Sequence, residues 1–270
     1  LVSGGIAIGL LLLAARIESR ARDVMMATPV HFRFDWPGAQ AASGRGSWLP
    51  ESFQTELRHL AALHMGENDP LGHEPLARLG EALEASGWFD QRPTIRREAG
   101  GIVHVSGSWR IPVAAVRIAG NDLPVSRAGK IMPIPYEIGE SGLAVVYGME
   151  GLPPLQADGS LDYATRWDAP DLEAGLELLD LLRDFAHAPR IAGVDVSEFG
   201  RARMLTLLID SGARVRWGGP VGTFNPAEVP TDLKITRLAR LFEEGHLAEP
   251  TLVLDLYHEH AILRVPAPQD

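Results

Sequence analysis

The chain has 270 residues, 46% of them hydrophobic, which suits one large or two small domains with buried cores. Its formal net charge of −10 argues against a nucleic-acid partner, because phosphate binding requires a basic surface. The absence of cysteine excludes disulfides, thiol catalysis and cysteine-type zinc sites. The 20 prolines and 28 glycines favour a turn-rich protein with strands over a helical bundle.

The amino-terminal residues Val2–Ala15 carry no charge, and the first charged side chain is that of Arg16. A membrane-spanning helix needs roughly 20 apolar residues, so this run is short for one. Because the sequence begins at a leucine, we expect a truncated transmembrane signal anchor over residues 1–23; a cleaved signal peptide and a buried helix are the alternatives. Three arginines just after the segment, at 16, 20 and 22, would ordinarily favour a cytoplasmic flank and oppose export of the chain that follows.

The next residues predict one compact module. Residues 29–36 alternate apolar and polar side chains, as a half-buried strand does. Two amphipathic helices follow, marked by apolar residues at helical spacing: Phe53, Leu57, Leu60 and Leu63 in the first, and Leu76, Leu79 and Leu83 in the second. Two strands then flank a turn at residues 99–101, and the first strand is Thr94–Glu98. Strand, helix, helix, strand, strand is the order of a POTRA module.

Beyond Ile118 the pattern predicts a second, strand-rich domain. We expect a hairpin over residues 123–133, a helix that starts in the Asp168–Asp171 region, a strand over 190–197, a hairpin over 203–217 and a helix capped by Thr231. Two final strands are predicted at residues 251–258 and 260–265. The sequence therefore predicts an α+β protein with an N-terminal membrane helix, a β-α-α-β-β module and a strand-rich α+β domain.

Several short motifs resemble the bacterial cell-division proteins FtsQ and DivIB. The motifs are Gly87–Phe89 for a Trp-containing turn, Thr94–Arg97 for a basic strand, Trp109–Ala114 for an "R-x-P-V-A" junction, and Asp255–His258 and Ile262–Arg264 for the last two strands. Trp109 replaces an acidic residue that is usual in the family, and Tyr257 and His258 stand where the family has Arg and Tyr.

This resemblance implies a domain organisation and a role. It implies a membrane anchor over 1–23, a POTRA domain over 24–110, an FtsQ-type beta domain over 111–266 and a tail over 267–270. It also implies a non-catalytic, single-pass scaffold of the division machinery in the cytoplasmic membrane, with most of the chain in the periplasm. The implied domain junction consists of Trp109, Arg110, Pro112 and Val113.

The resemblance also implies partners and a site for them. The partners would be FtsB/DivIC-like and FtsL-like single-pass coiled-coil proteins, recruited by strand addition at the carboxyl end. The residues carried over to that site are Tyr257, His258, Ala261, Ile262, Leu263 and Arg264. The alternative is that the apolar residues of these strands are ordinary core.

The sequence also contains short patterns that could indicate a catalytic or metal-binding site. His258 and His260 would share one face of a strand about 6.6 Å apart, but no third metal ligand accompanies them, so a solvated strand end is favoured. The Ser141 and Ser211 turns lack the G-x-S-x-G pattern of a nucleophile elbow. The sequence predicts no enzyme, cofactor or metal; the competing hypotheses are a POTRA-bearing protein of a secretion or envelope-assembly pathway and an exported enzyme of unrecognised type.

Overall fold

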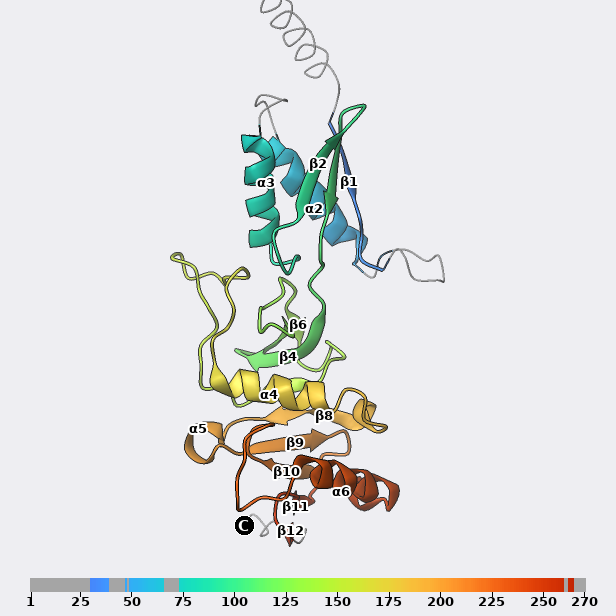
Figure 1. Cartoon of the computed structure of the whole chain (residues 1–270), viewed down its shortest axis with the longest axis vertical. Helices are drawn as coiled ribbons and strands as arrows, with labels where there is room; N and C mark the ends of the chain where they lie inside the picture. The colour runs from blue at the N-terminus through green and yellow to red at the C-terminus, as the bar shows by residue number, and fades with distance from the viewer. Residues whose placement is uncertain (1–29, 39–46, 48, 66–72, 260–261, 265–270) are drawn as a thin grey trace, which may run out of the picture. The chain divides into compact units, whose positions relative to one another are not determined.

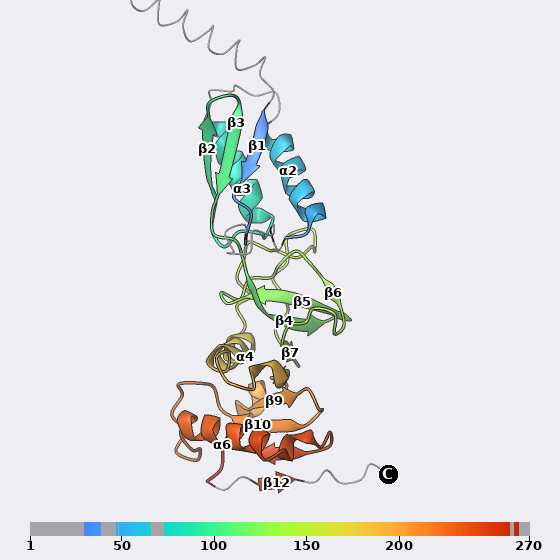
Figure 2. The same ribbon diagram turned by 90° about the vertical axis from the view of Figure 1, so that its right-hand side faces the viewer.

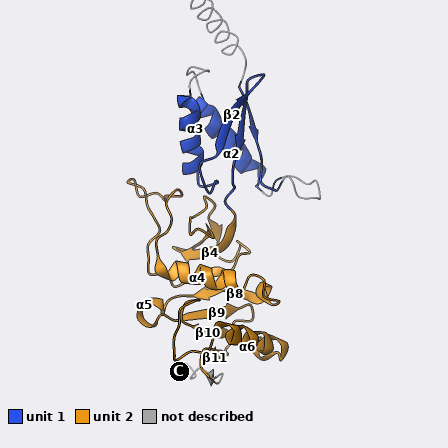
Figure 3. Cartoon of the chain, viewed as in Figure 1, with its two compact units in different colours: residues 1–110 blue, residues 111–270 orange. Residues whose placement is uncertain are grey.

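The computed structural model describes residues 30–38, 47, 49–65, 73–259 and 262–264, and over these residues the protein is a mixed α+β structure with five α-helices (Figure 1). The α+β class predicted from the sequence is confirmed. The chain forms two compact units, residues 1–110 and 111–270 (Figure 3). The predicted signal anchor (1–23) and tail (267–270) lie outside the described residues, and none of the described helices is long and apolar enough to cross a membrane.

The first unit contains β1 (His31–Phe34), α2 (Glu51–Met65), α3 (Glu74–Ala85), β2 (Thr94–Glu98) and β3 (Ile102–Ser106). Its sheet has the order β1-β3-β2, in which β3 pairs parallel with β1 and antiparallel with β2. The predicted order of elements is confirmed, and β2 has the predicted bounds. Both helices lie on one face of this sheet (Figures 1 and 2).

Apolar residues at helical and strand spacing meet between the helices and the sheet. Leu79 and Leu83 of α3 are fully buried, and Val103 and Val105 of β3 are 2% and 1% exposed. The prediction for Leu63 of α2 was wrong, because this side chain is 66% exposed and the buried residues of the helix are Leu57 and Ala61, four positions apart. A residue two positions beyond Ala61 points away from that face.

Replacement of Leu83 by alanine should lower the free energy of unfolding of the first unit by about 2–5 kcal/mol, because it leaves a cavity under the sheet. Leu63→Ala on the neighbouring helix is the control and should cost less than about 0.5 kcal/mol, since that side chain is exposed. Urea denaturation measures both. Equal effects would mean that α3 does not pack as described.

The second unit is built on one nine-stranded mixed sheet of order β12-β11-β10-β9-β8-β7-β4-β5-β6. The strands are β4 (Pro112–Ile118), β5 (Asn121–Ser126), β6 (Tyr136–Glu137), β7 (Val145–Tyr147), β8 (Ile191–Asp195), β9 (Leu205–Ile209), β10 (Arg214–Gly218), β11 (Val253–Asp255) and β12 (Ile262–Arg264). The pairs β4–β7, β7–β8 and β10–β11 are parallel, and the other pairs are antiparallel.

Helices α4 (Pro170–Leu181) and α6 (Thr231–Glu243) pack against this sheet (Figures 1 and 2). The short helix α5 (Phe199–Ala202) follows β8. Leu172 and Leu178 of α4 and Leu238 of α6 are at most 1% exposed, and they belong to one core cluster with the strand residues Val194 and Val215. This packing stabilises the helices more than their intrinsic propensity does.

Helix α4 starts at Pro170, within the predicted Asp168–Asp171 region, whereas the predicted cap of α6 at Thr231 was wrong. The N-cap positions are Ala169 and Pro230, neither of which offers a side-chain hydrogen bond, and Thr231 is the first helical residue of α6. Pro170 takes the first turn of α4, where a missing N–H costs nothing. Asp171 in that turn instead accepts a hydrogen bond from the Glu150 N–H at 3.0 Å, so its carboxylate ties the preceding loop to α4.

An ion pair between the half-buried Arg117 and the buried Asp122 closes the β4–β5 hairpin. The Asp122 side chain is fully buried and accepts two hydrogen bonds from Arg117, at 2.7 and 2.9 Å, and one from the Gly139 N–H at 2.8 Å. The hydrogen bonds from Arg117 lower the pKa of Asp122 below its ordinary value. A carboxylate with a lowered pKa in the folded state stabilises the fold above the unfolded-state pKa, and this stabilisation is lost as the pH falls through the folded-state pKa.

Acidification below about pH 4 should therefore reduce the amide-exchange protection of residues 112–126, because protonated Asp122 no longer pairs with Arg117. Asp122→Asn should lower protection at pH 7 by the equivalent of about 1–3 kcal/mol and flatten its acid dependence. Asp184→Asn is the control, since the Asp184 side chain is 91% exposed. An unchanged acid dependence in Asp122→Asn would contradict the assignment.

Candidate partner-binding edge

The nine-stranded sheet ends at β12, whose outer side pairs with no strand among the residues that the structure describes. β12 pairs antiparallel with β11 in the register Val253↔Arg264, Leu254↔Leu263 and Asp255↔Ile262. β11 in turn pairs parallel with β10. An edge strand presents backbone N–H and C=O groups that another chain can pair with, so β12 is a candidate site for strand addition.

The register shows which backbone groups of β12 face outward. The Leu256 N–H donates to the Arg216 carbonyl of β10 at 2.9 Å, and the Leu252 carbonyl accepts from the Arg214 N–H at 2.8 Å. Since backbone groups alternate sides along a strand, the even-numbered residues of β11 bond to β10 and the odd-numbered ones face β12. Their partners, residues 262 and 264, therefore face β11, and Leu263 directs its N–H and C=O outward.

The structure separates the residues predicted for this site. Ile262, Leu263 and Arg264 form β12, whereas Ala261 lies outside the described residues. The prediction that Tyr257 and His258 belong to a strand was wrong, because β11 ends at Asp255. They lie in the bend that follows, with their rings 4.1 Å apart.

Arg237 of α6 explains why the strand ends there. Its guanidinium donates hydrogen bonds to the backbone carbonyls of Leu256, at 3.4 Å, and of His258 and Glu259. Carbonyls that would otherwise extend the ladder are thus directed toward one positive charge on the helix. Arg237 therefore positions the bend from which β12 starts.

A second set of contacts holds the loop that precedes α6. The Glu228 carboxylate accepts hydrogen bonds from the Gly219 N–H at 3.0 Å, from Asn225 Nδ2 at 2.9 Å and from Lys234 Nζ at 2.6 Å. We call these four residues the Glu228 brace. Lys234 is only 4% exposed, and its ammonium lies 5.2 Å from the centre of the buried Trp217 ring. Because each charge of the ion pair has a partner, the brace can form in a largely desolvated place.

The brace and Arg237 were not predicted. One signal was available: Lys234 stands in the first turn of a helix, where a positive charge is unfavourable to the helix dipole. A lysine in that position indicates an acidic partner nearby. Only the folded chain shows that this partner is the carboxylate of Glu228, which lies in a loop six residues earlier.

The residues of the predicted junction lie on either side of the boundary between the two units, which falls between Arg110 and Ile111. Trp109 donates from Nε1 to the Asp35 carbonyl at 2.7 Å, and its ring centre lies 4.3 Å from that of Phe89, with the two rings tilted by 33°. Arg110 is fully buried and donates to the Phe89 carbonyl at 3.0 Å; burial lowers the pKa of its guanidinium. These contacts fix the last residues of the first unit.

Pro112 and Val113 begin the second unit, as the first residues of β4. Val113 is 36% exposed, so its contribution is the start of a strand and not a buried contact.

The described residues hold no group of three His, Cys, Asp or Glu side chains that could bind a metal. His258 lies in the bend, so the strand face predicted to pair it with His260 is not formed, and His260 itself is outside the described residues. A cleft of about 470 Å³ beside α4 is lined largely by apolar and small residues, and among its charged side chains Arg127 pairs with Asp180 and Arg166 with Glu173.

The chain was compared with models of known protein families and with curated proteins, and neither comparison found a match. The candidate partner-binding edge is therefore supported by the geometry of β12 and not by similarity to known proteins.

Arg237→Met should reduce amide-exchange protection of residues 256–259 and 262–264 about tenfold, because hydrogen bonds from a charged donor to three carbonyls are lost. Protection in β9 and β10 should stay unchanged. Arg240→Met, three residues along the same helix, removes only an exposed pair with Glu244 and is the control. Equal exchange in the two variants would show that Arg237 does not hold the bend.

Proposed function

We propose that this protein is a non-catalytic, FtsQ-like scaffold of bacterial cell division. In this proposal a single N-terminal span anchors it in the cytoplasmic membrane, and the bulk of the chain is periplasmic. The observation that carries the proposal is the position of β12 at the edge of a nine-stranded sheet, near the carboxyl end of the chain. The carboxyl-terminal strands are where the resemblance to FtsQ and DivIB implies a partner.

The first unit supports the proposal through its order of elements. It has β-α-α-β-β order and a three-stranded sheet with β3 in the centre, which is the order expected of a POTRA module. The domains proposed are a POTRA domain over 24–110 and an FtsQ-type beta domain over 111–266. Such modules act by contact with other proteins, so no catalytic group is required.

The proposed partners are FtsB/DivIC-like and FtsL-like single-pass coiled-coil proteins. One of them would supply an extended segment that pairs with the outward N–H and C=O of Leu263. An open edge would also suit a POTRA-bearing protein of a secretion or envelope-assembly pathway, and the identity of the captured chain distinguishes the two.

The test is to capture the tagged full chain from its own cell envelope, beside a Leu263→Pro variant. Proline removes the outward N–H but leaves the groups of residues 262 and 264 that face β11. We expect the wild type to recover small coiled-coil division proteins and Leu263→Pro to recover at most about a tenth as much, since the added ladder loses a donor and meets a proline ring.

Ala157→Pro is the matched control. Ala157 is an exposed residue at the second position of a turn closed by a 3.0 Å hydrogen bond from the Gly159 N–H to the Gln156 carbonyl, where proline is favoured. Recovery of secretion or outer-membrane assembly components would replace the proposal with its alternative. A folded chain that captures nothing, or Leu263→Pro that captures as much as the wild type, would reject strand addition at β12.

A further inference from the structure

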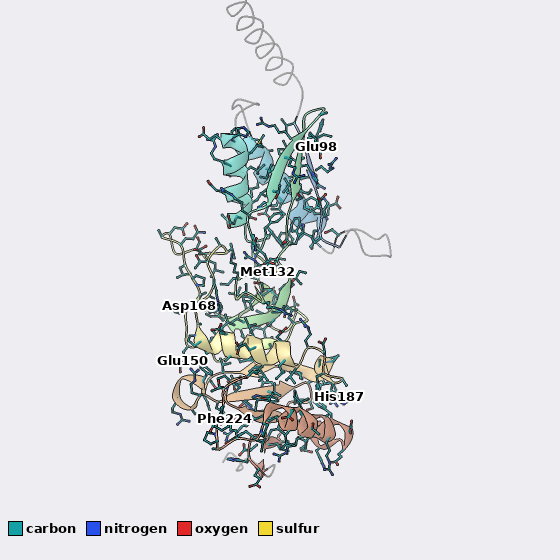
Figure 4. All side chains as sticks on the ribbon, in the orientation of Figure 1. Glu98, Met132, Glu150, Asp168, His187 and Phe224 are labelled. Carbon is teal, nitrogen blue, oxygen red and sulfur yellow. The ribbon has the colours of Figure 1, made fainter. Side chains whose placement is uncertain are left out.

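A row of polar side chains crosses the face of the nine-stranded sheet that is turned away from α4 and α6. Strands β8, β9, β10 and β11 lie side by side in the second unit (Figures 1 and 4). In register across them, Asp195 is opposite Thr206, Thr206 is opposite Arg216, and Arg216 is opposite Asp255. In each strand the preceding residue belongs to the core cluster under the helices, so the polar row is on the other face.

A hollow of about 280 Å³ lies over this row. Charged and hydroxyl side chains from β8, β9, β10 and the turn after β8 line it: Asp195, Ser197, Glu198, Thr206, Arg214 and Arg216. Among the described residues that line the hollow, only Val253 is apolar. Pockets for drug-sized molecules have volumes of roughly 300–1,000 Å³, so this hollow suits a smaller and strongly polar molecule.

One pair of charges in the hollow is satisfied within the fold. The Asp195 carboxylate pairs with Arg214 across β9, and it also accepts a hydrogen bond from the Ser197 N–H at 3.0 Å. These contacts hold the turn after β8 in place and form one side of the hollow.

The second pair of charges is close but makes no hydrogen bond. The Arg216 guanidinium lies 4.0 Å from the Glu198 carboxylate and 3.8 Å from that of Asp255, whereas a hydrogen bond to nitrogen needs about 2.7–3.2 Å. Within the described part of the chain, the side chains of Arg216 and Glu198 have no hydrogen-bond partner. Both are partly accessible, at 29% and 40% exposed, so a bound molecule can reach them.

Thr206 adds an independent observation. This residue lines the hollow and is only 9% exposed, yet its hydroxyl has no hydrogen-bond partner among the residues that the structure describes. A buried hydroxyl without a partner costs free energy, and most such groups in proteins are paired. A molecule in the hollow would supply the missing partner.

The charges of the hollow indicate the chemistry of that molecule. A guanidinium pairs best with a carboxylate, and the Glu198 carboxylate pairs with a cation such as an ammonium group. A ligand with one sign of charge would meet like charges, because guanidinium and carboxylate groups both line the hollow. Since Arg216 and Glu198 are 4.0 Å apart, the two charges of the ligand must be on neighbouring groups. An α-amino acid has this arrangement.

We propose that this hollow binds a small α-amino acid through its ammonium and carboxylate groups. The ligand carboxylate pairs with Arg216 and accepts a hydrogen bond from the Thr206 hydroxyl, while the ligand ammonium pairs with Glu198. Because Val253 is the apolar part of the lining, a small aliphatic side chain fits best. This site is separate from strand addition at β12 and does not rest on the proposed function.

The test is saturation-transfer NMR on the purified full chain, titrated with L-alanine. Two matched compounds remove one charge each: N-acetylalanine lacks the ammonium and alaninamide lacks the carboxylate. We expect saturable binding of alanine with a Kd in the millimolar range, and at least about tenfold weaker binding of both blocked compounds, since each loses a charge-assisted contact.

Variants of the lining locate the binding site. Glu198→Gln and Thr206→Val keep the shape of each side chain, and we expect them to weaken alanine binding about tenfold and about fivefold. Arg201→Gln is the control and should change the Kd less than about twofold, because the Arg201 side chain is 84% exposed and does not line the hollow. An unchanged urea midpoint shows that a loss of binding is local.

The outcomes decide for or against the site. Absence of saturable alanine binding, equal binding of the three compounds, or an unchanged Kd in folded Glu198→Gln would reject it, and the polar row would then be a solvated sheet face. If Glu198→Gln does not fold, the blocked compounds and Thr206→Val decide. None of these results bears on the capture of partner proteins by β12, so the two proposals fail independently.

Discussion

The carboxyl-terminal edge of the protein depends on one guanidinium. Arg237 binds carbonyls of the bend after β11, and the ladder between β10 and β11 ends just before this bend, at the pair of Arg216 with Asp255. Without that positive charge these carbonyls would need other donors or water. The bend gives the chain room to reverse, and β12 then returns antiparallel on the outside of β11. An open edge near the carboxyl end is the consequence.

At the same end of the sheet, a buried carboxylate determines the path of a surface loop. The Glu228 brace couples the end of β10, the loop and the first turn of α6 through one carboxylate. Such a pair contributes little net stability over an apolar replacement, but each of its charges requires the other. The brace therefore fixes the path of the loop between β10 and α6. In the first unit Arg110 plays a comparable role, since its buried side chain donates a hydrogen bond to the Phe89 carbonyl.

Much of the fold could be predicted because burial imposes periodicity on the sequence. The alternation in residues 102–106 and the leucines at 79 and 83 follow from the need to cover one face of a sheet with helices. The errors occurred where a contact distant in sequence decides. Leu63 fitted the predicted stripe but is exposed, Thr231 is the first residue of its helix and not the cap, and Tyr257 and His258 lie outside the predicted strand.

The sequence by itself determined the α+β class, the order of elements in the first unit and the two apolar strands near the carboxyl end, because each of these depends on neighbours along the chain. Only the tertiary structure decided that β12 is one edge of the sheet and that Leu263 directs its backbone groups outward. Strand order and register depend on which segments meet in space. A local pattern of side chains contains no information on which of a strand's two edges will stay open.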